Sequence, residues 1–482
     1  MTISAYAVWQ VRTGGSNTNG GGYDSTISGA GTDYSQQNAA QWTTTSVTSS
    51  GTTCTDNNSH GTLTSAMIGN AVWLSGNAYF VLTVPTANTF TVDRAPGVTA
   101  VAAHLGGAWA DPFVNPSNNS GIVQPGNTVS INGSGSQNPT SDDYTTASSL
   151  FLPAIGNMGG NGQVKFIGKN GRPRLGFPGA GWGYAEGNLF QNLYFAANGT
   201  ANASVGVLST VVTQGATTVA NCTFDQNGYD VTLFSGSGAM ISQCEFTTTH
   251  AARGTTANPA VYLVHFGALI FASNVHDTLG AGIQIEAGLG TRIVGNIIAK
   301  CGGDGIVTTS YGDLSEGNGC AIIGNTIDAN AGNGITFYGE AQLMAFLVMN
   351  NLITNHTGGG KYGISANFGS TAANDRNKCY LNWNFFYGNT TDLLSLSLNS
   401  ASMQNNATGT NPGYAAQSTE GYNLGTALKA AGYPGAAFPQ SLSKTATRSY
   451  VSPGAVQRFT GAVASAALPS GVLFDHFFIP RA

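Results

Sequence analysis

Few residues in this chain are of types that could act on a substrate. Of 482 residues, 22 are Asp or Glu and seven are His. Asp313 and Glu316 lie in the loop 310–319 beside Tyr311, and Asp304 lies between two glycines a few residues earlier. Two carboxylates close together can hydrolyse a glycosidic bond, so these three acids are the candidate catalytic residues. Turn and loop roles are the competing interpretation.

Aromatic side chains in predicted outward loops could stack on sugar rings. The candidates for carbohydrate binding are Tyr311, Tyr338 and Trp383, and the same rings could instead fill a seam between subunits. His276 and Asp277 are adjacent, but neighbours on a strand point to opposite faces, which argues against a catalytic dyad. The other histidines are dispersed without ligand spacing, so we expect no metal ion and no cofactor.

The six cysteines are spread along the chain with no CxxC pair. They are therefore predicted to be reduced core residues and not a disulfide framework. Cys222 and Cys244 occupy equivalent places in successive repeats, so we expect their side chains to stack.

Composition narrows the class of protein further. Charged residues make up only 8% of the chain, 67 residues are glycine, and the formal net charge is −5. Lys and Arg are scattered singly, which argues against a nucleic-acid partner, and no basic amphipathic helix is present to bind a membrane. A polar surface of Asn, Ser, Thr, Gln and Gly favours turn-dense β structure.

The chain contains an internal repeat. An Asn or Gln opens a short apolar segment eight times at spacings of 22 to 33 residues, at Asn192, Asn221, Gln243, Asn274, Asn296, Asn325, Asn351 and Asn384. A second polar position follows five residues later, at Asn330 and Asn389. A Gly-Ile pair then introduces a run with period two, which is typical of a strand.

This repeat predicts an all-β fold built around a right-handed parallel β-helix. Each strand would pair with its equivalent one coil away, with apolar side chains stacked inside and Asn ladders at the turns. A glycine before each Ile would permit the bend into the next strand. A sandwich or a propeller would not keep these signals in phase over eight copies.

Three regions are expected along the chain. Residues 1–115, with predicted antiparallel strands at 67–74, 79–84 and 88–94, form a small β domain that caps the solenoid or attaches it to a partner. Residues 116–400 form the β-helix. Residues 401–482 are predicted to form an irregular C-terminal cap or assembly segment with one short helix at 424–431.

The repeat resembles the right-handed β-helix superfamily, which includes pectate lyases, polygalacturonases and phage tailspikes. Gly303-Asp304-Gly305 resembles the paired-aspartate motif of polygalacturonases, but the second aspartate is absent. The N-terminal layout and the segments 425–434 and 454–458 resemble β-helix proteins encoded in tailed-phage genomes. The resemblance implies a virion protein more than any particular chemistry.

The first hypothesis is a bacteriophage virion surface protein: a capsid decoration, a fibre or a tailspike-like receptor-binding β-helix. It would be a homotrimer that contacts other virion proteins and a host surface glycan. The first residues lack a charged or apolar leader, as expected for assembly in the host cytoplasm. The alternative is a polysaccharide depolymerase, either a glycoside hydrolase or a lyase, on a tailspike. A cellular adhesin is a third reading.

Overall fold

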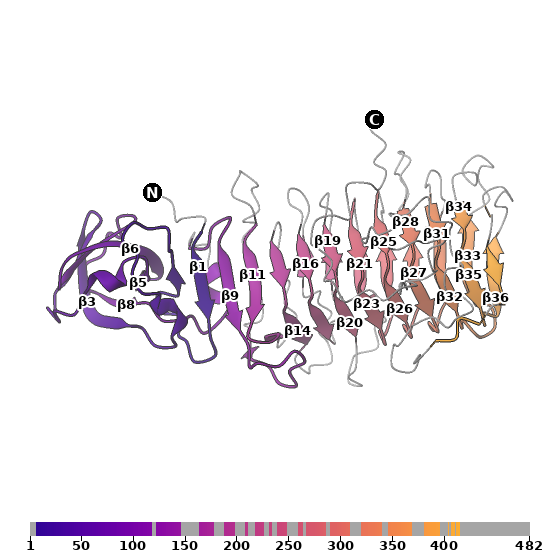
Figure 1. Cartoon of the computed structure of the whole chain (residues 1–482), viewed down its shortest axis with the longest axis horizontal. Coiled ribbons are helices and arrows are strands. Elements are labelled where there is room, and N and C mark those ends of the chain that lie inside the picture. The colour runs from indigo at the N-terminus through magenta and orange to yellow at the C-terminus, as the bar shows by residue number, and fades with distance from the viewer. Residues whose placement is uncertain are drawn as a thin grey trace, which may run out of the picture. The chain divides into compact units, whose positions relative to one another are not determined.

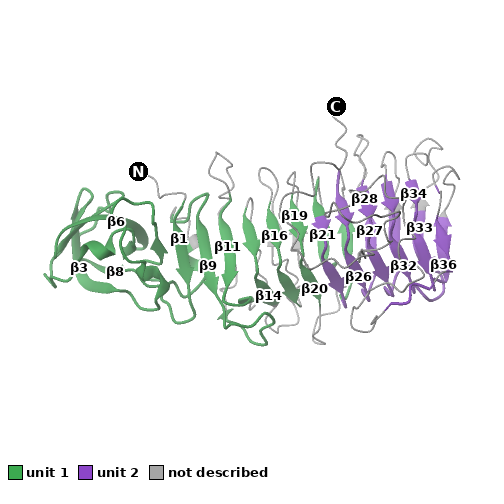
Figure 2. Ribbon diagram, in the orientation of Figure 1, with its two compact units in different colours: residues 1–269, 278–286 green, residues 270–277, 287–482 purple. Residues whose placement is uncertain are grey.

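The computed structural model divides the chain into two compact units, shown in green and purple in Figure 2. Unit 1 comprises Met1–Leu269 and Thr278–Glu286, and unit 2 comprises Ile270–Asp277 and Ala287–Ala482. The structure describes residues 6–117, 122–145, 163–177, 188–197, 208–210, 217–225, 231–233, 239–247, 259–263, 267–285, 290–308, 320–339, 346–368, 380–395, 403, 406–409 and 411–414 (Figure 1).

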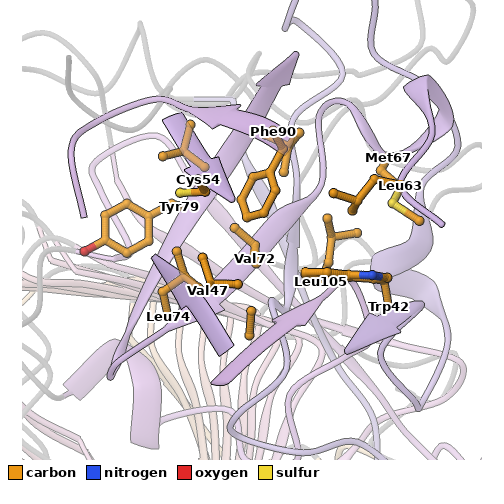
Figure 3. Packing of buried hydrophobic residues seen from close by; sticks show 13 residues of the cluster. Trp42, Val47, Cys54, Leu63, Met67, Val72, Leu74, Tyr79, Phe90 and Leu105 are labelled. Carbon is orange, nitrogen blue, oxygen red and sulfur yellow. The ribbon is translucent and has the colours of Figure 1, made fainter. Parts of the chain in front are cut away.

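Unit 1 contains a small closed barrel of antiparallel strands in the order β3-β4-β7-β6-β5-β8. The strands are β3 (Trp42–Ser50), β4 (Thr53–Asp56), β5 (Ala71–Leu74), β6 (Asn77–Thr86), β7 (Thr89–Val92) and β8 (Val101–Leu105). The three antiparallel strands predicted in this region correspond to β5, β6 and β7. Alternating side chains fill the barrel with a core that includes Trp42, Val72, Phe90 and Leu105 (Figure 3).

The remainder of unit 1 is built from three parallel sheets. The first sheet contains β1 (Val8–Val11), β9 (Thr128–Asn132), β11 (Lys165–Lys169), β13 (Leu189–Gln191), β16 (Thr218–Ala220) and β19 (Met240–Ser242). The second contains β10 (Tyr144–Thr145), β12 (Arg174–Phe177), β14 (Tyr194–Ala197), β17 (Thr223–Asp225) and β20 (Glu245–Thr247). The third contains β15 (Leu208–Thr210), β18 (Val231–Leu233), β21 (Val261–Leu263) and β24 (Ile283–Ile285).

Unit 2 repeats the same three-sheet plan. Its first-sheet strands are β25 (Arg292–Val294), β28 (Cys320–Ile323), β31 (Phe346–Met349) and β34 (Tyr380–Asn382). Its second-sheet strands are β23 (Asn274–His276), β26 (Ile297–Ala299), β29 (Thr326–Asp328), β32 (Leu352–Thr354), β35 (Phe385–Tyr387) and β37 (Ala407–Thr408). Its third-sheet strands are β27 (Ile306–Thr308), β30 (Ile335–Gly339), β33 (Tyr362–Phe368) and β36 (Thr391–Ser395).

The remaining elements are short. They are β2 (Gly22–Tyr23), which pairs antiparallel with β1, η1 (Tyr34–Gln36), η2 (Ser65–Met67), α1 (Val114–Ser117) and β22 (Leu269–Phe271). None of the helices in the described ranges is long and apolar enough to span a lipid bilayer. The expected all-β parallel β-helix with a small N-terminal β domain is confirmed.

Inward side chains stack from coil to coil in both units. In unit 1 the rings of Phe195, Phe224 and Phe246 follow one another at centroid distances of 4.9 Å and lie within 11° of parallel. In unit 2 the equivalent inward positions include the aliphatic Ile327 and Ile353, which are followed by Phe386. Each strand therefore buries every second side chain against its equivalent in the next coil, which is what the period-two pattern predicted.

The predicted asparagine ladder is confirmed in unit 2. It runs through Asn296, Asn325, Asn351, Asn384 and Asn406 at the turn between the first and second sheets. In each step the side-chain amide of one Asn donates to Oδ1 of the next at 2.9–3.1 Å. The same Oδ1 accepts the backbone N–H of the earlier Asn.

In unit 1 the repeat is shifted by one residue relative to this ladder. Asn192, Asn221 and Gln243 adopt positive φ angles of 51° to 57° and precede the ladder position, which is taken by an apolar residue or a cysteine. Asn at such a turn is favoured because it tolerates the left-handed conformation. The repeat identified in the sequence therefore mixed two turn positions: the left-handed residue in unit 1 and the ladder residue directly after it in unit 2.

The cysteines are buried, as predicted. Cys54, Cys222, Cys244, Cys301 and Cys320 are free thiols, and the sixth lies outside the described residues. Cys222 and Cys244 occupy the ladder position of successive coils, directly before Thr223 and Glu245, which pair in register, so the two cysteines stack as expected. Burial raises the pKa of Cys222 well above the ordinary thiol value.

Little of the predicted C-terminal region 401–482 is described, and the helix expected at 424–431 lies outside the described residues. After β37, Tyr414 packs against Leu352 and Phe385 on the outward face of the second sheet in unit 2. Its hydroxyl lies 3.0 Å from Oγ1 of Thr354. The chain thus returns along this sheet after the final strand pair.

Candidate functional site

Of the three acids singled out from the sequence, the structure describes only Asp304. Asp304 accepts the backbone N–H of Asn333, one coil away, at 2.6 Å. It therefore supports a turn of the next coil. Asp313, Glu316 and Tyr311 lie outside the described residues.

Two aromatic candidates remain. Tyr338 belongs to β30, but its side chain lies outside the described structure. Trp383 is half-buried and precedes the ladder residue Asn384 with φ of 59°. A bulky side chain is uncommon in this conformation, and the equivalent positions of the two preceding coils hold Asn350 and Gly324. Trp383 therefore occupies the corner between the first and second sheets.

We expected the side chains of His276 and Asp277 to point to opposite faces of a strand, and this premise was wrong. Asp277 lies just outside β23 and has φ of 51°, so the alternation of a strand does not apply to it. Its Oδ2 lies 2.8 Å from Nδ1 of His276. The pair is bonded, with His276 buried on the second sheet and Asp277 exposed.

The strongest group of polar side chains lies on the outward face of the second sheet in unit 1. Arg174 pairs in register with Tyr194, Tyr194 with Thr223, and Thr223 with Glu245. The alternate residues of these strands, such as Phe195 and Phe224, are fully buried in the core, so the polar side chains face outward. We call Asp142, Arg172, Arg174, Tyr194, Thr223, Asp225, Glu245 and Thr247 the polar row.

Tyr194 links a cation to a carboxylate in the polar row. The Arg174 guanidinium lies over the Tyr194 ring, 5.0 Å from its centroid, and Nε of Arg174 donates to Oδ1 of Asp142 at 3.0 Å. The Tyr194 hydroxyl donates to Oδ2 of Asp225 at 2.8 Å. Burial first, and then the bond to Asp225, raise the pKa of Tyr194, so this hydroxyl stays protonated at neutral pH.

A second chain of bonds reaches the other carboxylate. The Arg172 guanidinium donates to Oγ1 of Thr223 and, at 2.9 Å, to Oδ1 of Asn221. Thr223 in turn donates to Oε2 of Glu245 at 3.2 Å. Thr223 and Asp225 are 1% and 4% exposed, although both face outward from the sheet, whereas Glu245 is half-buried.

Two buried polar atoms of the polar row have no hydrogen-bond partner within the described residues. They are Nε of Arg172 and Oγ1 of Thr247, which follows Glu245 on β20 and pairs in register with Asp225. Buried polar atoms are almost always bonded in folded proteins, so each such atom requires an explanation. Both atoms are closed to solvent, so they do not themselves present a binding surface.

Donors and acceptors thus alternate along the polar row, and two carboxylates belong to it. Such a surface suits a ligand with many hydroxyl groups, since each hydroxyl both donates and accepts. No group of three His, Cys, Asp or Glu side chains that could hold a metal ion occurs in the described part of the chain.

Sequence reasoning missed the polar row. Tyr194 and Glu245 were read only as parts of the anchor segments, and Asp225 was not considered. A signal for the row was present in the sequence: three of its residues stand two positions after a left-handed turn residue. The pairs are Asn192 and Tyr194, Asn221 and Thr223, and Gln243 and Glu245.

Comparisons with known proteins concern the fold. Residues 205–386 match the family model described as right handed beta helix region. Together with the parallel sheets, this match shows that the chain carries a right-handed parallel β-helix. A search of the curated proteins finds no match.

Solved structures with similar folds share little sequence with this chain. Pectate lyase Pel9A is 14% identical over 70% of this chain and 89% of its own, with a TM-score of 0.37. A mannuronic acid specific polysaccharide family 6 lyase from human gut microbiota is 12% identical over 62% and 80%, with a TM-score of 0.31. Tailspike protein 3 of bacteriophage CBA120 is 12% identical over 59% and 57%, with a TM-score of 0.25. None of these likenesses bears on function.

Proposed function

We propose that this chain is a surface protein of a bacteriophage particle that binds a host glycan along the polar row. The observation that supports the glycan is the alternation of hydrogen-bond donors and acceptors along the outward-facing polar row, from Arg172 and Tyr194 to Asp225 and Glu245. Sugar hydroxyls would bond to the exposed part of Glu245.

The rigidity of the β-helix supports binding of this kind. The polar row stands on strands whose inward neighbours are stacked phenylalanines, so its side chains are held at fixed spacings. Sites on regular elements keep their geometry better than sites on loops. The place on a virion is supported by the resemblance of the flanking segments to phage proteins.

A glycan-binding panel tests the proposal. Isothermal titration of the full chain with host capsule and lipopolysaccharide fragments should identify one that binds. Tyr194→Phe and Glu245→Gln should then weaken binding roughly 10- to 100-fold, since the first breaks the bond that positions Asp225 and the second removes the charge from an acceptor on the surface. Tyr6→Phe, at a side chain 74% exposed, is the matched control and should leave the affinity unchanged. If the native protein and the three variants bind the glycan with equal affinity, the polar row is not the binding surface.

Cleavage of the glycan is the second candidate function, and the presence of both Asp225 and Glu245 in the polar row favours it. One carboxyl group would protonate the leaving oxygen, and the other, ionised, would act as base or nucleophile. Reducing ends should then accumulate during incubation with the bound glycan. Asp225→Asn and Glu245→Gln should each lower that rate at least about 100-fold, since each removes one of the two acid–base groups. If the glycan binds and no reducing ends are released, the protein binds its receptor without cleaving it.

The location on a particle has its own test. Antibodies raised against the recombinant chain should label purified phage particles in immunogold electron microscopy. Absence of label on intact particles that contain the chain by mass spectrometry would place it inside the particle and contradict a surface role.

A further inference from the structure

A second buried ladder follows the turn after the second sheet in unit 2. Asn330, His356 and Asn389 occupy the same turn position in successive coils, as the sequence predicted for the two asparagines. His356 is fully buried, and it stands where its neighbours in the ladder are asparagines. It is therefore the ionisable member of an otherwise neutral ladder.

The orientation of the two asparagine amides is fixed by their other bonds. Oδ1 of Asn330 accepts the backbone N–H of Cys301 at 2.9 Å, so its Nδ2 is the atom that faces Nε2 of His356 at 3.2 Å. Oδ1 of Asn389 accepts the backbone N–H of His356 at 3.0 Å and lies 2.9 Å from its Nδ1.

These contacts select one state of the imidazole. Nε2 must accept from Asn330, and Nδ1 must donate to Asn389, so only the neutral ring with its proton on Nδ1 satisfies both partners. Gly334 lies next to this ring, since a Cβ added to the glycine would be only 3.0 Å from Cε1 of His356.

We propose that His356 makes its turn of the β-helix sensitive to acid. When Nε2 of His356 takes up a proton from the solvent, the turn opens. The added N–H would face the N–H of Asn330, and two donors at 3.2 Å repel each other. The imidazolium recovers hydrogen bonds only when the turn opens to water.

The charged groups around the ring do not compensate for its burial. Asp328 on β29 favours the charged imidazole, whereas Lys361 disfavours it. Asp392 bonds to Nδ2 of Asn389 at 3.0 Å. Burial is the largest effect, and it lowers the pKa of His356 from 6.5 to about 4.

The sign of the effect follows from linkage. The folded pKa lies below the unfolded one, so the unfolded turn binds more protons at acid pH. The stability that depends on neutral His356 is therefore fully present above about pH 6.5 and is lost as the pH falls toward 4. Within this range the equilibrium constant for opening the turn rises roughly tenfold for each pH unit.

Hydrogen exchange of the full chain at pH 7, 5.5 and 4.5, corrected for the intrinsic rate, tests the proposal. Amides of β32 and of the turn at 355–356 should lose protection in the native protein as the pH falls. In His356→Asn they should keep it, because asparagine continues the ladder without titrating. His104→Asn, at a half-buried histidine on β8 of the barrel, is the control and should behave like the native protein. An identical acid response in His356→Asn and the native protein would overturn the proposal.

A second measurement needs no variant. Nitrogen NMR of the native protein with labelled histidine should show one imidazole that stays neutral, with its proton on Nδ1, down to about pH 5, since burial holds its pKa near 4. A His356 resonance that reports a charged ring or a proton on Nε2 at pH 7 would contradict the proposal, even if His356→Asn does not fold.

Discussion

At the residue scale, close packing requires the glycine in three of the Gly-Ile pairs. A Cβ on Gly305, Gly334 or Gly363 would lie 2.5–2.6 Å from a backbone carbonyl oxygen of the next coil. None of the three has a positive φ. The sequence signal was therefore read correctly as structural, but its reason is the close approach of two coils and not a bend of the backbone.

Gly334→Ala should therefore destabilise the protein. The methyl group would meet the carbonyl oxygen of Gly363 at 2.5 Å, so the backbone of one coil must shift, at a cost of about 1–3 kcal/mol. Urea unfolding measures the change. Gly359→Ala is the matched control, because nothing lies within 4 Å of its added methyl group. A loss in Gly359→Ala as large as in Gly334→Ala would show that the packing explanation is wrong.

The buried thiols should react slowly. Burial raises the pKa of Cys54 and Cys320 to about 12, so almost none of either thiol is ionised at neutral pH. With the native protein, a disulfide reagent such as dithionitrobenzoate should modify at most one of the six cysteines within minutes, and with the protein in guanidinium all six. Rapid modification of two or more in the native state would contradict their placement in the core.

The polar row shows why function was harder to predict than fold at this scale. Tyr194, Asp225 and Glu245 have different chemistries and lie far apart in sequence, so no motif links them. Only the register of β14, β17 and β20 places them side by side, and each of these strands begins two positions after a left-handed turn residue.

At the scale of elements, the asparagine ladder of unit 2 should contribute strongly to stability. Asn325→Ala removes the acceptor for two N–H groups of Asn296 and leaves the carbonyl of Ile293 without its donor. Each buried group left without a partner costs about 1–3 kcal/mol, so a total loss of about 2–5 kcal/mol is expected in urea unfolding. Asn138→Ala, at an exposed asparagine, should change stability by less than about 0.5 kcal/mol. Comparable losses would mean that the ladder has no special role.

The strands themselves were predictable where apolar residues alternate and glycine or asparagine marks the turns. The same reasoning could not separate the ladder position from the residue before it, because Asn suits both. His276 and Asp277 show a similar limit, since a left-handed residue directly after a strand brings two neighbouring side chains together.

At the scale of the whole molecule, the homotrimer is a prediction, and the outward face of the first sheet is the surface that we expect sister chains to cover. In unit 2, Leu347 and Met349 alternate with the buried Val348 and are half-buried, and Leu347 pairs in register with Tyr380, which is 48% exposed. Light scattering at micromolar concentration should therefore report three chains per particle, since this apolar face would be covered by sister chains. Leu347→Lys should shift the protein toward single chains. A native protein that is already monomeric would contradict the homotrimer.

The insertion of the barrel between β1 and β9 has a consequence for the order of folding. Later ladder contacts join residues 22 to 33 positions apart, whereas the indole of Trp9 donates to Asn127, 118 positions away. Closing a longer loop costs more chain entropy and slows the step. Strand β1, which precedes the other strands of this chain, should thus be among the last to be placed. Until it pairs, β9 presents an open edge to which a neighbouring chain can add.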